Sequence, residues 1–236
     1  MALAVDFPAT LQWSQRVELS PRVSGIVRQV EVNSGDSVKK GQRLLSLDAA
    51  VYEARVAEGR ALVARGSEEL ADAKRELGRT QELYDRTVIA TSELDQARLR
   101  QARAKAQLEA AQAKLRVEQK NLADSQLTAP FDAVVVARMA EAGQYAAVSL
   151  QPQPLLVLAK AGEMLARFRV PADKVAALKP GSPATVVADK QEFPASLKAI
   201  GLEPVKDKDG VVYEVEAVFM PKTLLRAGLP ATVRLP

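Results

Sequence analysis

The sequence predicts an elongated α+β chain of several domains. We expect a small β-sandwich divided into two halves, an antiparallel helical hairpin inserted between the halves, and a small β-barrel after them. Residues 49–125 contain no proline and repeat large side chains every seven positions, whereas the residues on both sides alternate apolar and polar side chains. The two alternating blocks also resemble each other, which indicates that they form one folded unit.

The proline-free segment is expected to form an antiparallel coiled coil of two helices, each about 35 residues and therefore roughly 50 Å long. Large residues recur every seven positions, with Gln101 filling the one gap, at Val56, Val63, Leu70, Leu77 and Tyr84, and then at Leu94, Leu108, Leu115 and Leu122. The residues three positions later are mostly small, among them Gly59, Gly66, Ala97 and Ala104. A heptad that pairs large with small residues brings two helix backbones close together.

The two heptad series are out of register with each other, and the break at residues 85–91 predicts the turn of the hairpin. Ser92 precedes an acidic first turn and is expected to cap the second helix. The second helix carries another apolar stripe, which includes Leu99, Ala102, Ala106 and Ala113. This stripe either widens the seam between the two helices or forms a lateral surface for neighbouring copies of the hairpin.

The flanking blocks, residues 20–48 and 127–160, form an internal repeat. A shift of 108 positions places Gly25 on Ala133, Val27 on Val135 and Gly35 on Gly143. Each block is too small to bury its own apolar face, because an isolated hairpin of strands is marginally stable. We therefore expect both blocks to pack into one sandwich, with residues 49–126 inserted as the hairpin.

Residues 161–236 predict a β-barrel. Several short apolar runs alternate with turn residues, including Asp209-Gly210, and Pro171–Leu178 is a candidate for a short helix. Residues 1–19 precede the sandwich, and we assign them to the barrel because residues 10–19 can supply a further strand.

The composition argues against several functions. The chain has no cysteine and no histidine, which removes the commonest metal ligands and the commonest general base. No motif places a nucleophile or a carboxylate pair, so we expect no catalytic residues, no enzyme activity, no metal site and no cofactor. A net charge of +4 with interleaved acids and bases gives no reason to expect nucleic acid as a partner. No run of residues is apolar and long enough to cross a bilayer.

The order of these elements resembles the periplasmic adaptor family, also called membrane fusion or HlyD-like proteins. The likeness rests on Ser20–Val27 and Gly35–Leu45, on the return half Leu127–Val135, and on the ending Leu225–Leu229. It implies a split lipoyl/biotinyl-like sandwich and an adaptor that links an inner-membrane transporter, of RND or ABC type, to a TolC-like outer-membrane channel. The resemblance implies that this link serves the export of drugs or other small molecules, and that the adaptor self-associates into a ring, a trimer or a hexamer.

The resemblance also implies a docking site at the hairpin tip. The family pattern is an arginine, a leucine four residues later and a serine seven residues beyond that. Arg79 and Leu83 match, whereas Ala90 stands at the serine position; Val88 and Ile89 complete the candidate site. The alternative is that Arg79 and Leu83 are ordinary coiled-coil residues.

The resemblance places the protein in the periplasm, attached to the inner membrane by a signal or anchor segment that we expect to lie outside this chain. We expect the membrane-proximal domain to be largely absent as well. Two other functions stay open: a lipoyl or biotinyl carrier, which would need an exposed lysine between the two halves, and a metal-efflux adaptor. The soft ligands for the latter are Met1, Met139, Met164 and Met220, and we expect the last three to lie in cores.

Overall fold

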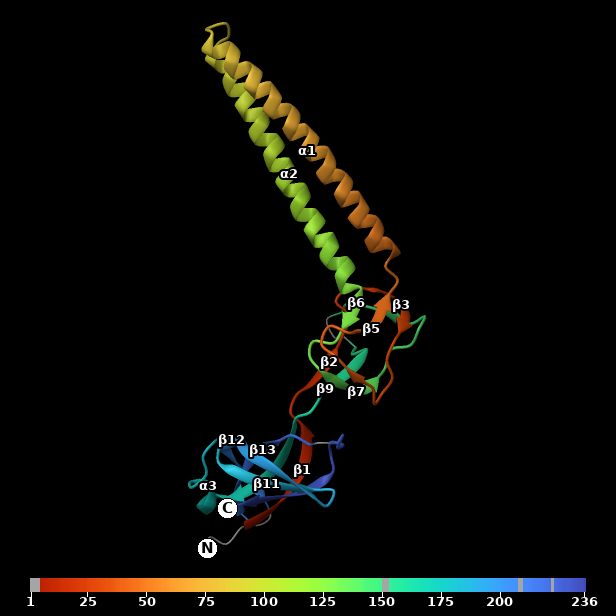
Figure 1. Ribbon diagram of the computed structural model, residues 1–236, viewed down its shortest axis with the longest axis vertical. Coiled ribbons are helices and arrows are strands. Elements are labelled where there is room, and N and C mark those ends of the chain that lie inside the picture. The colour runs from red at the N-terminus through yellow and green to blue at the C-terminus, as the bar shows by residue number, and fades with distance from the viewer. Residues whose placement is uncertain (1–4, 150–152, 208–209, 222) are drawn as a thin grey trace.

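The computed structural model describes residues 5–149, 153–207, 210–221 and 223–236. The molecule is elongated, with three parts in a row (Figure 1). Two long helices, α1 (Ala50–Asp85) and α2 (Thr91–Asp124), project from one end of a small β-sandwich, and a β-barrel lies at its other end. None of the helices in these ranges is both long and apolar enough to span a membrane.

The sandwich consists of two four-stranded sheets, in the orders β2-β9-β7-β4 and β6-β5-β3-β8. The strands of its first half are β2 (Arg16–Leu19), β3 (Gly25–Val30), β4 (Ser37–Val38) and β5 (Arg43–Leu47). Those of its second half are β6 (Gln126–Thr128), β7 (Ala133–Arg138), β8 (Tyr145–Ala146) and β9 (Leu156–Lys160). Both halves supply the buried core, for example Val27, Leu44, Val135 and Leu158.

The internal repeat appears in the structure as matching contacts between the two halves. The amide of Gly35 donates to the carbonyl of Val135 at 2.8 Å, and the amide of Gly143 donates to the carbonyl of Val27 at the same distance. Both glycines have positive φ angles, 96° and 88°, which a residue with a side chain rarely adopts. Each half therefore donates an equivalent hydrogen bond to a strand of the other half, as the sequence repeat predicts.

The segment before the repeat is divided between the barrel and the sandwich. We expected residues 1–19 to join the barrel; residues 1–4 lie outside the described ranges, and β1 (Val5–Trp13) is a barrel strand. The assignment is wrong for β2, which pairs with β9 so that Val17 faces Leu158 and Leu19 faces Leu156. This pairing extends the apolar sheet of the sandwich by one strand.

The barrel is closed in the order β1-β10-β13-β12-β11-β14. Its remaining strands are β10 (Met164–Pro171), β11 (Pro183–Ala188), β12 (Gln191–Asp207), β13 (Gly210–Phe219) and β14 (Pro230–Leu235). Phe7 packs against Phe168 and Phe193 against Phe219 in its core. The predicted short helix is only Ala172–Val175 (α3), and Asp209 of the predicted turn lies outside the described residues.

An ionic contact joins the sandwich to the barrel next to the chain crossing between β9 and β10. The carboxylate of Glu163 accepts a 2.9 Å hydrogen bond from Lys160 of β9, and the ammonium of Lys198 on β12 lies 3.8 Å away. The hydrogen bond from Lys160 lowers the pKa of Glu163, so this carboxylate stays ionised.

The two long helices run antiparallel and pack closely along α1's glycines (Figure 1). A Cβ added at Gly59 would lie 3.4 Å from the Cα of Leu115, and one added at Gly66 would lie 3.3 Å from the Cα of Leu108. Large residues of one helix therefore sit against small residues of the other, as the heptads predict. The predicted cap at Ser92 is wrong: the N-cap position is Ala90, two residues earlier, and α2 begins at Thr91 without a side-chain capping hydrogen bond.

Candidate docking site at the hairpin tip

The end of α1 determines the shape of the tip. Beyond Asp85, the amide of Thr87 donates to the carbonyl of Tyr84 at 2.8 Å, and the amide of Val88 donates to the carbonyl of Leu83 at 3.0 Å. These two bonds form a Schellman motif, which ends the helix with a residue in the left-handed region. That residue is Thr87, with a φ of 61°.

The tip exposes apolar side chains at the far end of the molecule. Val88 is 65% exposed and Leu83 is 42% exposed, whereas Ile89 is half-buried. Ala90 is exposed and offers no hydroxyl where the family pattern has serine. Two large apolar side chains in water at the end of a hairpin form a small surface that can be buried against a partner.

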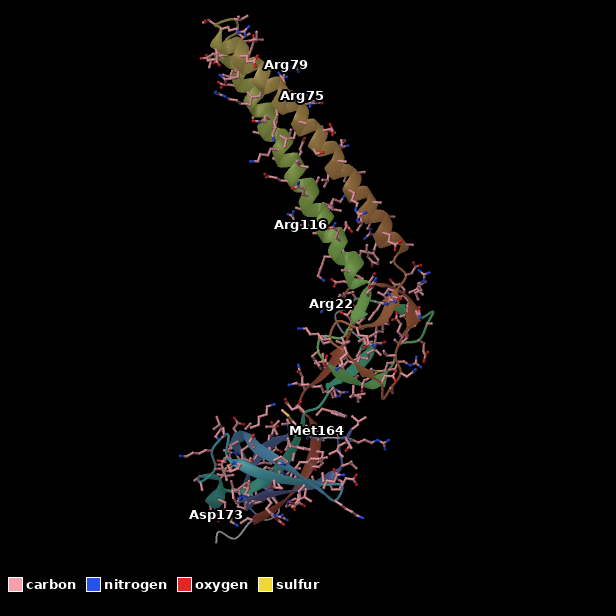
Figure 2. All side chains as sticks on the ribbon, in the orientation of Figure 1. Arg22, Arg75, Arg79, Arg116, Met164 and Asp173 are labelled. Carbon is pink, nitrogen blue, oxygen red and sulfur yellow. The ribbon has the colours of Figure 1, made fainter. Side chains whose placement is uncertain are left out.

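Arg79 lies below the tip on α1, where Figure 2 shows it near the end of the hairpin. Its guanidinium donates a 2.9 Å hydrogen bond to Oε2 of Glu76, one turn earlier in the same helix. The side chain of Arg79 is mostly in water and that of Glu76 is about half exposed, and ion pairs of this kind at the surface contribute little free energy. The guanidinium can therefore exchange Glu76 for an acceptor on a partner. Glu76 is a residue that the sequence patterns did not single out.

The second apolar stripe of the hairpin lies outside the helix seam. Leu99 is 50% exposed, and Ala102, Ala106 and Ala113 are exposed as well. The seam instead buries Leu94, Ala97 and Ala104 of α2. The stripe therefore does not widen the seam, and its use as a lateral contact stays a prediction.

The methionines give no support for a metal site. Met164 is buried in the barrel core, but Met139 is 45% exposed and Met220 is 72% exposed, so the expectation that all three lie in cores is wrong for these two. Met1 lies outside the described residues. Within the described ranges, no three histidine, cysteine or acidic side chains cluster as metal ligands would.

Comparison with known protein families gives one match that spans the sandwich and the hairpin. The family described as "RND MFP, barrel-sandwich hybrid domain" matches residues 15–159. This range begins just before β2 and ends within β9, so it includes both halves of the sandwich with the helices between them.

Curated relatives carry names from drug export. The macrolide export protein MacA of Yersinia pestis is 32% identical over 94% of this chain and 64% of its own length. The multidrug resistance protein MdtA of Cronobacter turicensis is 27% identical over 76% of this chain and 44% of its own length. The chain thus spans less than two thirds of these relatives.

Solved structures share the fold. The membrane fusion protein Spr0693 of Streptococcus pneumoniae superposes with a TM-score of 0.77 at 14% identity, covering 98% of this chain and 99% of that one. A MacA-MexA chimera with the α-hairpin of Pseudomonas aeruginosa MexA gives a TM-score of 0.66 at 21% identity, covering 98% of this chain and 80% of the chimera. Because the family match covers more than half of the chain and the fold agrees, this protein belongs to the RND membrane fusion protein family of periplasmic adaptors.

Proposed function

We propose that this chain is the adaptor subunit of an efflux pump and acts in the periplasm. It links an inner-membrane transporter, of RND or ABC type, to a TolC-like outer-membrane channel for the export of drugs or other small molecules. Family membership supports this proposal, as do the names of relatives such as the antibiotic efflux pump periplasmic linker protein ArpA of Pseudomonas putida, which is 34% identical over 48% of this chain.

The main support for the proposal is the exposed apolar tip of the long hairpin, at Leu83 and Val88. Helices of 36 and 34 residues hold Leu83 and Val88 roughly 50 Å from the sandwich. Apolar side chains that are in water at such a distance contribute nothing to the core of their own chain, and burial against a channel would remove them from water. Arg79, Ile89 and Ala90 complete the proposed docking surface.

The parts of the chain have separate roles in this proposal. Residues 16–48 and 127–160 form the lipoyl-like sandwich, residues 49–126 form a coiled-coil hairpin, and residues 161–236 with β1 form the barrel. Copies assemble side to side into a closed ring, a trimer or a hexamer, with Leu99, Ala102, Ala106 and Ala113 as lateral contacts of the hairpins. The partner transporter supplies the energy, and this chain carries out no chemistry and binds no nucleic acid.

A double substitution at the tip tests the proposal. Arg79→Glu with Leu83→Asp reverses one charge and places another in the apolar surface, and both positions are exposed, so the fold should not change. The variant is produced in cells that lack the native adaptor, and the minimal inhibitory concentration of exported drugs is measured. We expect resistance to fall to the level of the deletion strain.

A matched control has the same spacing and the same charges away from the tip. Ala61→Asp with Arg65→Glu changes two exposed residues of α1 that are also four positions apart. We expect this control to retain resistance, and circular dichroism of both purified variants should match the parent chain. Full resistance in the tip variant would contradict the docking assignment.

A further inference from the structure

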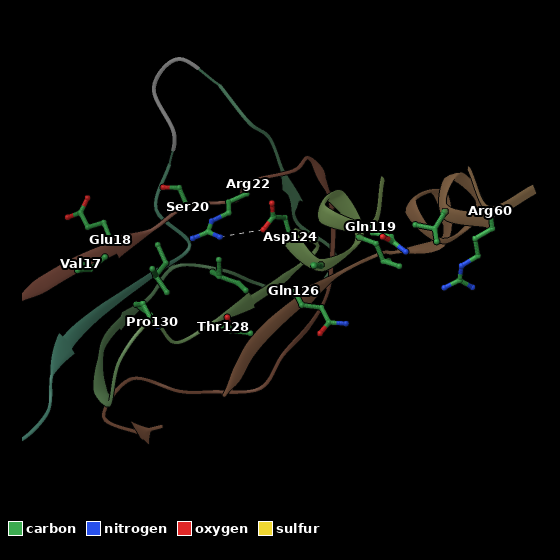
Figure 3. Close-up of a pocket in the computed structure, with 15 residues that line it drawn as sticks. Val17, Glu18, Ser20, Arg22, Arg60, Gln119, Asp124, Gln126, Thr128 and Pro130 are labelled. Atoms are coloured by element: carbon green, nitrogen blue, oxygen red, sulfur yellow. Dashed lines mark hydrogen bonds and ion pairs between the residues drawn. The ribbon is translucent and has the colours of Figure 1, made fainter. Parts of the chain in front are cut away.

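A cleft lies where the base of the hairpin meets the sandwich, far from the tip. Its volume is about 820 Å³, and its walls come from both parts of the molecule (Figure 3). β2, the loop after it and β6 form one side, and the first turns of α1 and the last turns of α2 form the other. This volume is within the range of pockets that hold small organic molecules.

Much of the cleft wall is apolar. Val56 of α1 and Leu127 of β6 are nearly buried, and Val17, Leu19 and Leu122 are half-buried beside them. The half-buried side chains still expose apolar area to water, and a ligand with an apolar body would remove that area from contact with water. The cleft therefore favours a partly apolar ligand.

The two acids that line the cleft are each paired with a cation that does not line it. Four charged residues line it: Glu18, Arg22, Arg60 and Asp124. The carboxylate of Glu18 accepts a 2.7 Å hydrogen bond from Arg16, outside the cleft. Arg60, in contrast, forms no ion pair with any of the residues that the structure describes.

Asp124 is already neutralised as well. Lys120 of the same helix bonds its carboxylate, and Arg22 lies 3.4 Å from the same oxygen, as Figure 3 shows. A separation of 3.4 Å is long for a charged hydrogen bond, so Arg22 retains donors for another acceptor. The two acids of the cleft are thus paired, whereas the guanidinium groups of Arg22 and Arg60 can bind an anion.

We propose that this cleft binds an amphipathic anion, a molecule with an apolar body and a carboxylate, sulfonate or phosphate head. The apolar body packs against Leu19, Leu122 and Leu127, and the guanidinium of Arg60 binds the head, because a guanidinium group pairs with such oxyanions through two parallel hydrogen bonds. The ligand would contact both the sandwich and the hairpin. This site is independent of the tip, so it neither requires nor supports the docking proposal.

Binding to the purified chain tests the inference. The probe is 8-anilinonaphthalene-1-sulfonate, whose fluorescence rises in apolar surroundings, and decanoate below its micellar concentration is the competitor. We expect one saturable site per chain, displacement of the probe by decanoate but not by the uncharged decanol, and weaker binding at high salt. Equal displacement by decanol would show that the apolar wall acts alone and would overturn the inference.

Three variants locate the site. Arg60→Ala removes the unpaired guanidinium, and we expect the dissociation constant to rise about tenfold. Arg65→Ala is the matched control, because it is an exposed arginine of the same helix that does not line the cleft, and it should leave binding unchanged. Ala123→Trp, at an exposed position of the cleft wall, should block binding without altering the core. Unchanged binding in both Arg60→Ala and Ala123→Trp, or no saturable binding by the parent chain, would refute the proposal.

Discussion

The backbone amide of Lys40 donates a 2.8 Å hydrogen bond to Oδ1 of Asp132, a residue 92 positions away in the other half of the sandwich. The ammonium of Lys39 lies 3.2 Å from the second oxygen of the same carboxylate. The carboxylate of Asp132, in the second half of the sandwich, therefore binds two consecutive residues of the first half. The hydrogen bond from Gly41 to the carbonyl of Ala129, at 2.8 Å, continues the same contact.

Removal of the Asp132 carboxylate should make the free energy of unfolding less dependent on pH in the acidic range. The amide of Lys40, with Lys39 in addition, lowers the pKa of Asp132 below its ordinary value of 3.8. A lowered folded-state pKa means that the contribution of Asp132 is fully present above about pH 4 and is lost as the pH falls through the folded value. We expect Asp132→Ala to lower the urea midpoint at pH 7 and to differ much less from the parent at pH 2.5.

The control for this experiment is Glu68→Ala, an exposed acid of α1. It should show little difference from the parent chain at either pH. A loss of stability in Asp132→Ala that is the same at pH 7 and pH 2.5 would show that the charge of this carboxylate is not what joins the halves.

Two glycines of α1 should respond to alanine in opposite ways. Alanine is favoured over glycine in a helix interior by about 0.5–1 kcal/mol. A Cβ at Gly78 meets no atom within 4 Å, so Gly78→Ala should stabilise the hairpin by that amount. A Cβ at Gly66 meets the backbone of Leu108 at 3.3 Å, so Gly66→Ala should separate the helices locally and destabilise them by about 1 kcal/mol. Urea unfolding followed by the helical circular dichroism signal measures both, and stabilisation by both would contradict the close packing.

Replacement of Thr87, the left-handed residue of the tip, by glycine should stabilise the chain. Thr87 is β-branched and has a φ of 61°, a conformation that costs a residue with a side chain about 1–2 kcal/mol. We expect Thr87→Gly to raise the free energy of unfolding by about 1 kcal/mol, because glycine adopts this conformation without strain. Arg86→Gly is the comparison, since Arg86 has a φ of −88° and should gain nothing. If Arg86→Gly stabilised the chain and Thr87→Gly did not, the backbone strain would not lie at Thr87.

The sandwich and the hairpin could be predicted because each follows a pattern along the sequence: an internal repeat for the sandwich, and a heptad of large and small residues for the hairpin. The repeat that relates Gly35 to Gly143 requires two equivalent turns, and the structure has both with positive φ. The alternation of large and small residues predicted which faces of the helices meet, and Gly59 and Gly66 lie there.

Other features depend on contacts that no local pattern encodes. The sequence predicted one barrel strand within residues 10–19, whereas the structure has β1 and β2 there, and the pairing of β2 with β9 assigns β2 to the sandwich. Ser92 has the residue type of a helix cap, yet α2 begins at Thr91, and the N-cap position is Ala90. The cleft at the hairpin base combines residues from Val17 to Pro130, so no single segment of the sequence indicates it.

Cross-linking from the tip tests the adaptor proposal most directly. The chain has no cysteine, so Val88→Cys introduces a single thiol at a position that is 65% exposed in the parent. A thiol-reactive photo-cross-linker is attached in cells that contain the assembled pump, and the adducts are identified by mass spectrometry. We expect an adduct between Val88→Cys and a TolC-like outer-membrane channel, and none with that channel from Glu68→Cys. A Val88→Cys variant that retains full drug resistance, is labelled efficiently and yet gives no channel adduct would contradict the adaptor proposal.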